Sequence, residues 1–157
     1  MLFRSQNWDF RPKENSPLVE GGKEVNKSEI KSLFVNFYHL PFQGKTPDIG
    51  AYEYGEPSYW IPGRQLSNAS TPIPLNKGGN IALDQDLMYL GAYKAKAHYI
   101  YFGDSPESLS LKEQHLDQNN IFDPGDLSPN KEYFWRVDAY VNGKLITGDL
   151  WSFKTRK

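Results

Sequence analysis

The stretch from Tyr133 to Tyr140 reads Tyr-Phe-Trp-Arg-Val-Asp-Ala-Tyr, with no glycine or proline to interrupt it. Aromatic and β-branched residues of this kind favour a pleated, half-buried strand. Because side chains alternate along a strand, one face is apolar and the other mixes aromatic residues with Arg136 and Asp138. The apolar face consists of Tyr133, Trp135, Val137 and Ala139. The stretch therefore predicts a strand with one face in a core.

Further strand-like segments follow one another at short spacing from about residue 71 onward, with turn signals between them. They are Thr71–Leu75, Ile81–Leu90, Ala97–Phe102, Leu109–Leu111, Ile121–Phe122 and Asp149–Thr155. Residues 76–80 are predicted as a turn, and the prolines of 71–75 indicate an edge strand. Asn142-Gly143 is a strong β-hairpin signal. Together they predict an all-β fold, an antiparallel sandwich over residues 71–157.

The N-terminal third looks different, because its apolar residues are too few and too scattered to form a core alone. Residues 1–56 contain a short strand signal at Trp8–Arg11 and a segment at 28–38 that reads either as a short helix or as a strand. Residues 57–70 are rich in turn residues and read as a linker. Within it, the pair Tyr59-Trp60 is expected to dock the linker onto a neighbouring surface.

Two motifs in the first segment carry a family resemblance. Ser16–Gly22 reads Ser-Pro-Leu-Val-Glu-Gly-Gly, and Pro47–Gly55 contains Asp-Ile-Gly-Ala-Tyr-Glu. This pair resembles the C-terminal closing segment of secreted right-handed parallel β-helix proteins, many of which are polysaccharide lyases or glycosidases. The resemblance implies that residues 1–56 are a short, partly irregular β-helix tail. The repeated coils themselves are missing from the sequence, which shows no internal period.

The second part resembles a fibronectin type III-like domain over nearly its whole length. The pattern Leu-x-Pro-x-x-x-Tyr-x-Trp-x-Val-x-Ala spans 127–139, and Ala97–Gly103 and Gly148–Phe153 match a subgroup attached to bacterial carbohydrate-active and surface proteins. The resemblance implies that Tyr133 forms a tyrosine corner, its hydroxyl bonding to the backbone just upstream. Tyr89 stands where that family usually has tryptophan.

Composition and spacing argue against most chemistry. The chain has no cysteine, and its 18 basic and 19 acidic residues give a net charge of -1, without the basic face that nucleic-acid binding needs. No stretch is apolar enough for a membrane span. His98 alternates with apolar residues and reads as a core histidine, whereas Asp84-Gln85-Asp86 lacks the rest of a calcium loop. We expect no catalytic residues, no cofactor and no metal site.

The carboxylate pairs Asp48 with Glu53 and Asp123 with Asp126 satisfy local turn motifs better than a glycosidase site. The remaining candidate site is the outward face of two predicted strands. It consists of Tyr99, Tyr101, Phe134, Arg136 and Tyr140. Such a face suits either carbohydrate binding or packing against another part of the protein, and a large exposed aromatic strip favours packing. Arg136 is expected to pair with Asp138 or to stack on Tyr99 or Tyr101.

These observations lead to a functional hypothesis. The chain is expected to be a non-catalytic accessory or capping module of a secreted bacterial β-helix protein associated with polysaccharides, located outside the cell or on its surface. Its partner would be its own β-helix domain. Two alternatives stay open: a carbohydrate-binding module, and a fragment of a polysaccharide lyase or glycosidase whose catalytic coils are absent.

Overall fold

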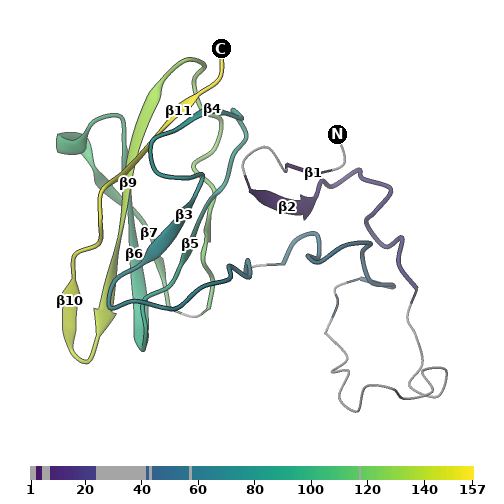
Figure 1. Ribbon diagram of the computed structural model, residues 1–157, viewed down its shortest axis with the longest axis horizontal. Coiled ribbons are helices and arrows are strands. Elements are labelled where there is room, and N and C mark those ends of the chain that lie inside the picture. Colours follow the sequence, from purple (N-terminus) through teal and green to yellow (C-terminus); the bar gives the residue numbers. More distant parts are fainter. Residues whose placement is uncertain (1–2, 5–7, 24–41, 43, 57, 117) are drawn as a thin grey trace. The chain divides into compact units, whose positions relative to one another are not determined.

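The computed structural model describes residues 3–4, 8–23, 42, 44–56, 58–116 and 118–157. The chain divides into two compact units, one of residues 1–5 and 9–56 and the other of residues 6–8 and 57–157 (Figure 1). Each unit is described by itself below. The segment at 28–38, for which the sequence favoured a helix or a strand, lies outside the described residues.

The second unit is a sandwich of two β-sheets. The larger sheet has the order β4 (Gly78–Ile81), β11 (Trp151–Thr155), β9 (Glu132–Val141), β6 (Ala95–Gly103), β7 (Ser110–His115), and β10 (Lys144–Ile146) pairs with the end of β9. The smaller sheet has the order β3 (Ser70–Ile73), β5 (Leu87–Leu90), β8 (Ile121–Phe122). A short 3₁₀ helix, Pro106–Ser108, connects β6 to β7. The predicted all-β sandwich is confirmed.

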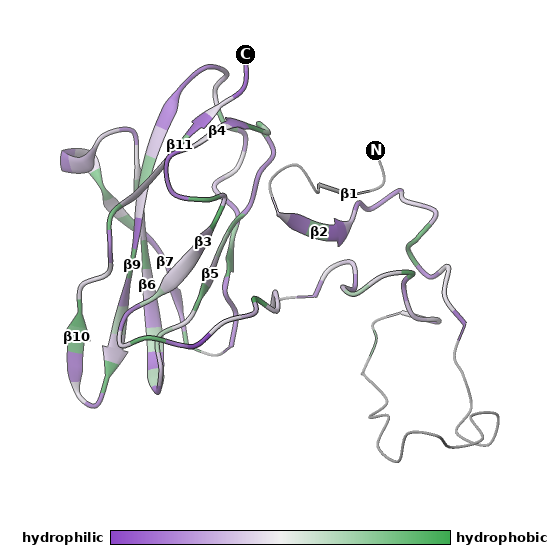
Figure 2. Cartoon of the chain, in the orientation of Figure 1, coloured by the Kyte–Doolittle hydropathy of each residue, from purple (hydrophilic) through white to green (hydrophobic). Residues whose placement is uncertain are grey.

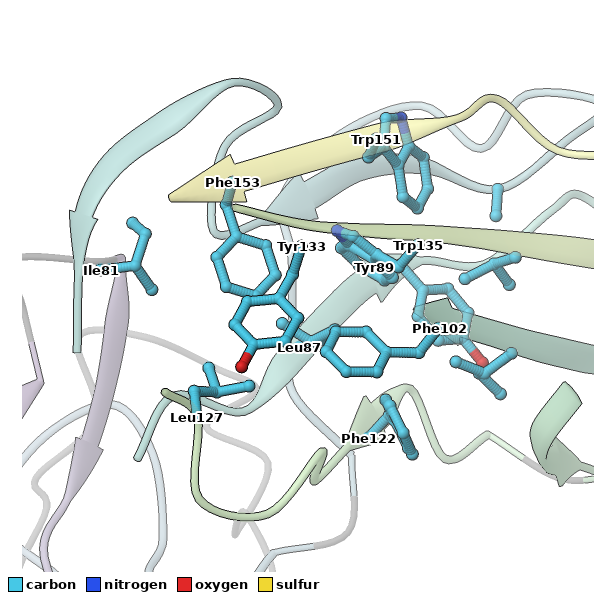
Figure 3. Close-up of a cluster of buried hydrophobic side chains, with 13 residues drawn as sticks. Ile81, Leu87, Tyr89, Phe102, Phe122, Leu127, Tyr133, Trp135, Trp151 and Phe153 are labelled. Carbon is cyan, nitrogen blue, oxygen red and sulfur yellow. The ribbon is translucent and has the colours of Figure 1, made fainter. Parts of the chain in front are cut away.

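The core lies between the two sheets and is built largely from aromatic rings. In β9 and β6, buried residues largely alternate with more exposed ones. Figure 2 shows that both strands carry hydrophilic as well as hydrophobic residues. Tyr133 stacks between Phe102 and Phe153, at ring-centroid distances of 5.2 and 5.7 Å, and Trp135 meets Trp151 edge-on at 4.7 Å (Figure 3). Offset and edge-to-face ring pairs of this kind add to the free energy gained from burial.

The tyrosine corner implied by the fibronectin type III resemblance is present. The Tyr133 hydroxyl accepts a hydrogen bond from the backbone N–H of Ser128 at 2.9 Å, just ahead of β9. Leu127 packs into the core beside it. The corner therefore fixes how the chain enters its longest strand.

Several local predictions are confirmed, and others are wrong. The Asn142-Gly143 dipeptide forms a two-residue hairpin in which Val141 pairs with Lys144, and both central residues have positive φ. Residues 76–80 were expected to be only a turn, yet Gly78–Ile81 forms β4, which pairs in parallel with β11. The larger sheet is therefore mixed rather than wholly antiparallel. The strand expected over 81–90 is interrupted: Ile81 ends β4, and only Leu87–Leu90 forms β5.

The first unit contains a short hairpin of β1 (Phe3–Arg4) and β2 (Asp9–Pro12), followed by irregular chain. In that irregular chain, the two quoted motifs lie side by side. The carboxylate of Asp48 accepts hydrogen bonds from the backbone of Glu20 at 2.6 Å and of Tyr54 at 2.7 Å. Backbone bonds also run from Gly22 to Pro47 and from Ile49 to Leu18. Asp48 therefore joins segments 28 residues apart.

The segment predicted as a linker is fixed on the sandwich along part of its length. Tyr59 and Ile61 are buried, whereas Trp60 is exposed. The side chain of Asn120 accepts from the N–H of Tyr59 and donates to its carbonyl, both at 2.7 Å. The expected aromatic docking is thus present at Tyr59. Among the described residues, no helix is long and apolar enough to cross a membrane.

A candidate contact face on the larger sheet

The register of β6 and β9 brings all five sequence-predicted site residues onto one outward face. Tyr101 lies opposite Arg136, Gly103 opposite Phe134, and Ala97 opposite Tyr140. The fifth residue, Tyr99, is two residues from Tyr101 along β6 and therefore lies on the same face of the sheet. We call the set of Tyr99, Tyr101, Phe134, Arg136 and Tyr140 the outer aromatic face.

Arg136 covers one of the rings on this face. Its guanidinium carbon lies 4.8 Å from the centroid of the Tyr101 ring, within the range of a cation–π contact. The stack expected from the sequence is therefore present, and it involves Tyr101. A flat ligand that needed this side of the Tyr101 ring would have to displace the guanidinium.

Arg136 is also held by a bidentate ion pair. Its Nε and Nη2 atoms donate to the two carboxylate oxygens of Asp138, at 2.8 and 3.1 Å. Asp138 was expected to be exposed, but it is only 2% exposed. It accepts a further hydrogen bond from the backbone N–H of Gly148 at 2.9 Å, so the chain leading into β11 covers it. The pair therefore joins β9 to this segment.

The other aromatic residues differ in how far they are available. Tyr99 is half-buried, and its hydroxyl accepts a hydrogen bond from Gln114 on β7 at 3.3 Å. Tyr140 is 38% exposed and lies opposite Leu145 of β10, which is 55% exposed. Leu111, opposite Tyr101 on β7, is 51% exposed. At the centre of the outer aromatic face, Asp138 balances the charge of Arg136. Exposed leucines lie on either side of it, Leu111 on β7 and Leu145 on β10.

The sequence did not identify Leu111 or Leu145 as neighbours of this face, and it placed Asp138 there beside Arg136 without indicating its burial. Leu111 and Leu145 were available as single apolar residues in strand-like segments, but only the pairing of β7 and β10 places them beside the tyrosines. The burial of Asp138 depends on Gly148, ten residues further on. Cross-strand neighbours of this kind follow from register, which a single sequence specifies weakly.

His98 is a buried histidine with a hydrogen-bond partner, as expected. Its Nε2 accepts from the backbone N–H of Ala92 at 3.0 Å, and its ring lies 5.2 Å from that of Tyr89. Burial, and secondarily the neighbouring His115, lower the pKa of His98 from its ordinary 6.5 to about 4. The Tyr89 hydroxyl lies 2.8 Å from Nδ1 of His115. The tyrosine at position 89 therefore has a polar partner.

The remaining sequence candidates have structural roles in the described chain. Both carboxylate oxygens of Asp48 accept backbone hydrogen bonds, and Asp123 accepts from the N–H of Gly125 at 2.7 Å, as in an Asx turn. Gln85 is buried between its acidic neighbours and donates to the carbonyl of Asp86. Within the described ranges, no group of three or more histidine, cysteine, aspartate or glutamate residues is placed to hold a metal ion.

Comparison with known proteins gives a match among solved structures. No protein-family model matches the chain, and no curated protein sequence matches it. Among solved structures, the chain is similar to the fibronectin type III domain of human fibronectin type III domain containing protein 3, with 12% sequence identity and a TM-score of 0.40. The match covers 61% of this chain and 91% of that domain.

Proposed function

We propose that the chain is a non-catalytic accessory module of a secreted bacterial β-helix protein associated with polysaccharides, and that its outer aromatic face packs against the β-helix domain. The observation that carries this proposal is the position of Arg136. It covers the Tyr101 ring and is neutralised by the buried Asp138. Tyrosine and arginine at the centre of a patch, with apolar residues beside them, are typical of protein contact surfaces.

The first unit supports the β-helix part of this proposal. The Ser16–Gly22 and Pro47–Gly55 motifs, which carry the resemblance, contact each other through Asp48 and through backbone hydrogen bonds. A side chain at Gly22 would meet the carbonyl of Pro47, which explains why glycine stands there. Solenoid ends expose an apolar layer and need a cap, so a closing coil followed by a sandwich has a physical purpose.

Removal of residues 1–56 tests the packing of the two parts. If the closing segment packs on the sandwich, the shortened chain will be less soluble and less stable than the full chain. The deletion also removes the carbonyl of Trp8, to which the Tyr59 hydroxyl donates at 2.8 Å. Full-length Tyr59→Phe is therefore the control for that single bond. Unchanged stability and solubility of the shortened chain, relative to this control, would contradict the packing.

A carbohydrate-binding module is the second candidate. It is favoured by the partly exposed Tyr140 and by the guanidinium of Arg136, whose Nη1 makes no hydrogen bond with the described residues. Affinity electrophoresis in polysaccharide gels tests it, with Tyr99→Ala and Tyr101→Ala as variants. Retardation of the natural chain that both variants abolish would support sugar binding, and an absence of retardation would exclude it for those polysaccharides.

The third candidate, a fragment of a polysaccharide lyase or glycosidase, concerns the parent rather than this chain. The nucleotide sequence upstream of the Met1 codon tests it. Repeated β-helix coils with an in-frame signal peptide would support a longer secreted parent. A promoter directly before Met1 would contradict the fragment hypothesis.

A further inference from the structure

Residues 58–66 form a strap that is attached to the sandwich at two separate points. At the first, Asn120 holds both backbone groups of Tyr59 and also donates to the carbonyl of Tyr89 at 2.9 Å. At the second, the N–H of Tyr93 donates to the carbonyl of Leu66 at 2.7 Å. Between these points Ile61 is buried. At the second attachment, the backbone N–H that precedes that of Tyr93 is bonded to a histidine ring.

That histidine is His98. The turn that follows β5 carries the N–H of Ala92, which donates to Nε2 of His98, and the next N–H along the chain is that of Tyr93, which holds the strap. Because Nε2 accepts a hydrogen bond, the neutral ring carries its proton on Nδ1. Gly91 packs so closely on the ring that an added Cβ would lie 3.0 Å from Cε1 of His98. The turn therefore has little room to adjust.

Protonation of His98 removes this acceptor. Both ring nitrogens then carry hydrogens, so Nε2–H faces the N–H of Ala92, donor against donor, inside the protein. A buried charge without a compensating partner costs several kcal/mol or forces a local rearrangement. The segment that can move is the turn with Ala92 and Tyr93, because β6 is held on both sides by β7 and β9.

The groups around His98 offer no compensation. From β5 the Tyr89 ring faces it, and from β7 its register partner is His115, whose Nε2 lies 3.2 Å from a Glu113 oxygen without a hydrogen bond. From β9 the register partner is Ala139. Lys94 and Lys96, both exposed, are the charged residues of the connection to β6. The positive charges of Lys94 and Lys96 disfavour a charge on His98. The negatively charged Glu113 lies beside His115 and not beside His98.

We propose that His98 is an acid-sensitive latch: its neutral ring holds the Ala92–Tyr93 turn, and through it the Leu66 end of the strap, and acid releases that end while the Asn120 attachment persists. The proposal is independent of the function proposed above. It predicts a local opening, in which the Leu66 end of the nine-residue strap opens in acid at a lower free energy than the Tyr59 end.

Amide hydrogen exchange of the full chain, corrected for intrinsic rates, tests the latch. Because the pKa of His98 is about 4 in the fold against an ordinary 6.5, the protection of the Ala92 and Tyr93 amides should fall roughly a hundredfold between pH 7 and pH 4. The amides of Tyr59 and Val137 lose protection only through global unfolding, so at pH 4 they should stay much better protected than the amides of Ala92 and Tyr93. Equal protection of all four amides at pH 4 would show global unfolding and overturn the proposal, as would constant protection at Ala92 and Tyr93.

His98→Gln provides the matched variant, because a glutamine oxygen can accept from Ala92 and does not titrate. In this variant the protection of Tyr93 should no longer depend on pH. A fall as large as in the natural chain would assign the effect to another group and contradict the latch. If the variant does not fold, NMR titration of the His98 ring in the natural chain decides. Its midpoint must coincide with that of the Ala92 and Tyr93 amides, and different midpoints would overturn the proposal.

Discussion

Asp138 is the residue that connects the outer aromatic face to the rest of the sandwich. It binds Arg136 through two oxygens and also accepts from the N–H of Gly148. In Asp138→Ala, the guanidinium and this N–H both lose their partner, and the half-buried arginine can turn toward water. We expect a loss of about 2 kcal/mol in the free energy of unfolding, measured by urea denaturation.

Glu132→Ala is the control for Asp138→Ala, because Glu132 is an exposed carboxylate on the same strand. Its unfolding free energy should stay within about 0.5 kcal/mol of the natural value. Equal effects of the two substitutions would contradict a specific role for Asp138.

The tyrosine corner can be tested by removing a single oxygen atom, the hydroxyl of Tyr133, and comparing the result with the same change at Tyr140. Tyr133→Phe deletes the hydroxyl that accepts from Ser128 and leaves the ring in the core. We expect a loss of about 1 kcal/mol in the unfolding free energy, the usual net value of one hydrogen bond. Tyr140→Phe removes the hydroxyl of a partly exposed ring and should have almost no effect in the same denaturation experiment. A neutral Tyr133→Phe would refute a stabilising corner.

At the residue scale, what the sequence could predict depended on how local the cause is. Tyr133 and His98 were foreseeable because alternation along a strand places them inward. The burial of Asp138 was not foreseeable, because its cover comes from Gly148 in a different segment. The same holds for His115, which lies in the core only because β7 pairs with β6 beside His98.

At the element scale, Gly148 determines how the chain enters β11. A Cβ added there would overlap the backbone carbonyl of Val137 on β9, so any larger residue would push the two segments apart. We expect Gly148→Ala to lower the unfolding free energy by more than about 2 kcal/mol, since a buried backbone clash cannot relax locally. Gly79→Ala is the control, because an added Cβ there meets nothing within 4 Å.

Thermal unfolding of the two glycine variants measures this difference. The melting temperature of Gly148→Ala should fall by several degrees, whereas Gly79→Ala should unfold close to the natural temperature. Equal melting temperatures would contradict this prediction, because they would mean that the backbones at Val137 and Gly148 can move apart without a loss of stability.

Elements were predictable where local chemistry was strong. The strand at 133–140 and the Asn142-Gly143 hairpin follow from residue preference alone, and both are present. β4 was missed because its Gly-Gly-Asn-Ile sequence has turn residues, and only its parallel pairing with β11 makes it a strand. The strand expected over 81–90 is interrupted because residues 83–84 form a turn, and the buried Gln85 follows it before β5 begins at Leu87.

At the scale of the whole molecule, stability should depend on pH through His98. The fold lowers the pKa of His98 from 6.5 to about 4, so the unfolded chain binds a proton that the folded chain excludes. This contribution to stability is fully present above pH 6.5 and is lost as the pH falls toward 4. It amounts to about 3 kcal/mol at most.

Urea denaturation at pH 7, 5.5 and 4 measures this dependence. His98→Gln should show a smaller loss of stability over the same interval than the natural chain. A parallel decline of the two proteins would contradict the role of His98, because carboxylates would then account for the whole effect.

The sandwich of the second unit could be predicted from spacing and alternation, but the purpose of its outer face could not. The sequence supplied the five residues of that face, whereas the contact of Arg136 with the Tyr101 ring appears only in the structure. Because of this contact, one side of the Tyr101 ring is covered by the guanidinium and is not available for stacking with a sugar. The prediction of a β-helix tail rests on the two motifs joined through Asp48.

NMR titration of the isotope-labelled full chain with soluble polysaccharides, neutral and acidic, tests the outer aromatic face most directly. We expect no shift of the ring signals of Tyr99, Tyr101 and Tyr140, because we propose this face as a protein contact surface and Arg136 covers the Tyr101 ring. A saturable shift confined to these rings and to the Arg136 side chain would contradict it and identify the face as a carbohydrate-binding site.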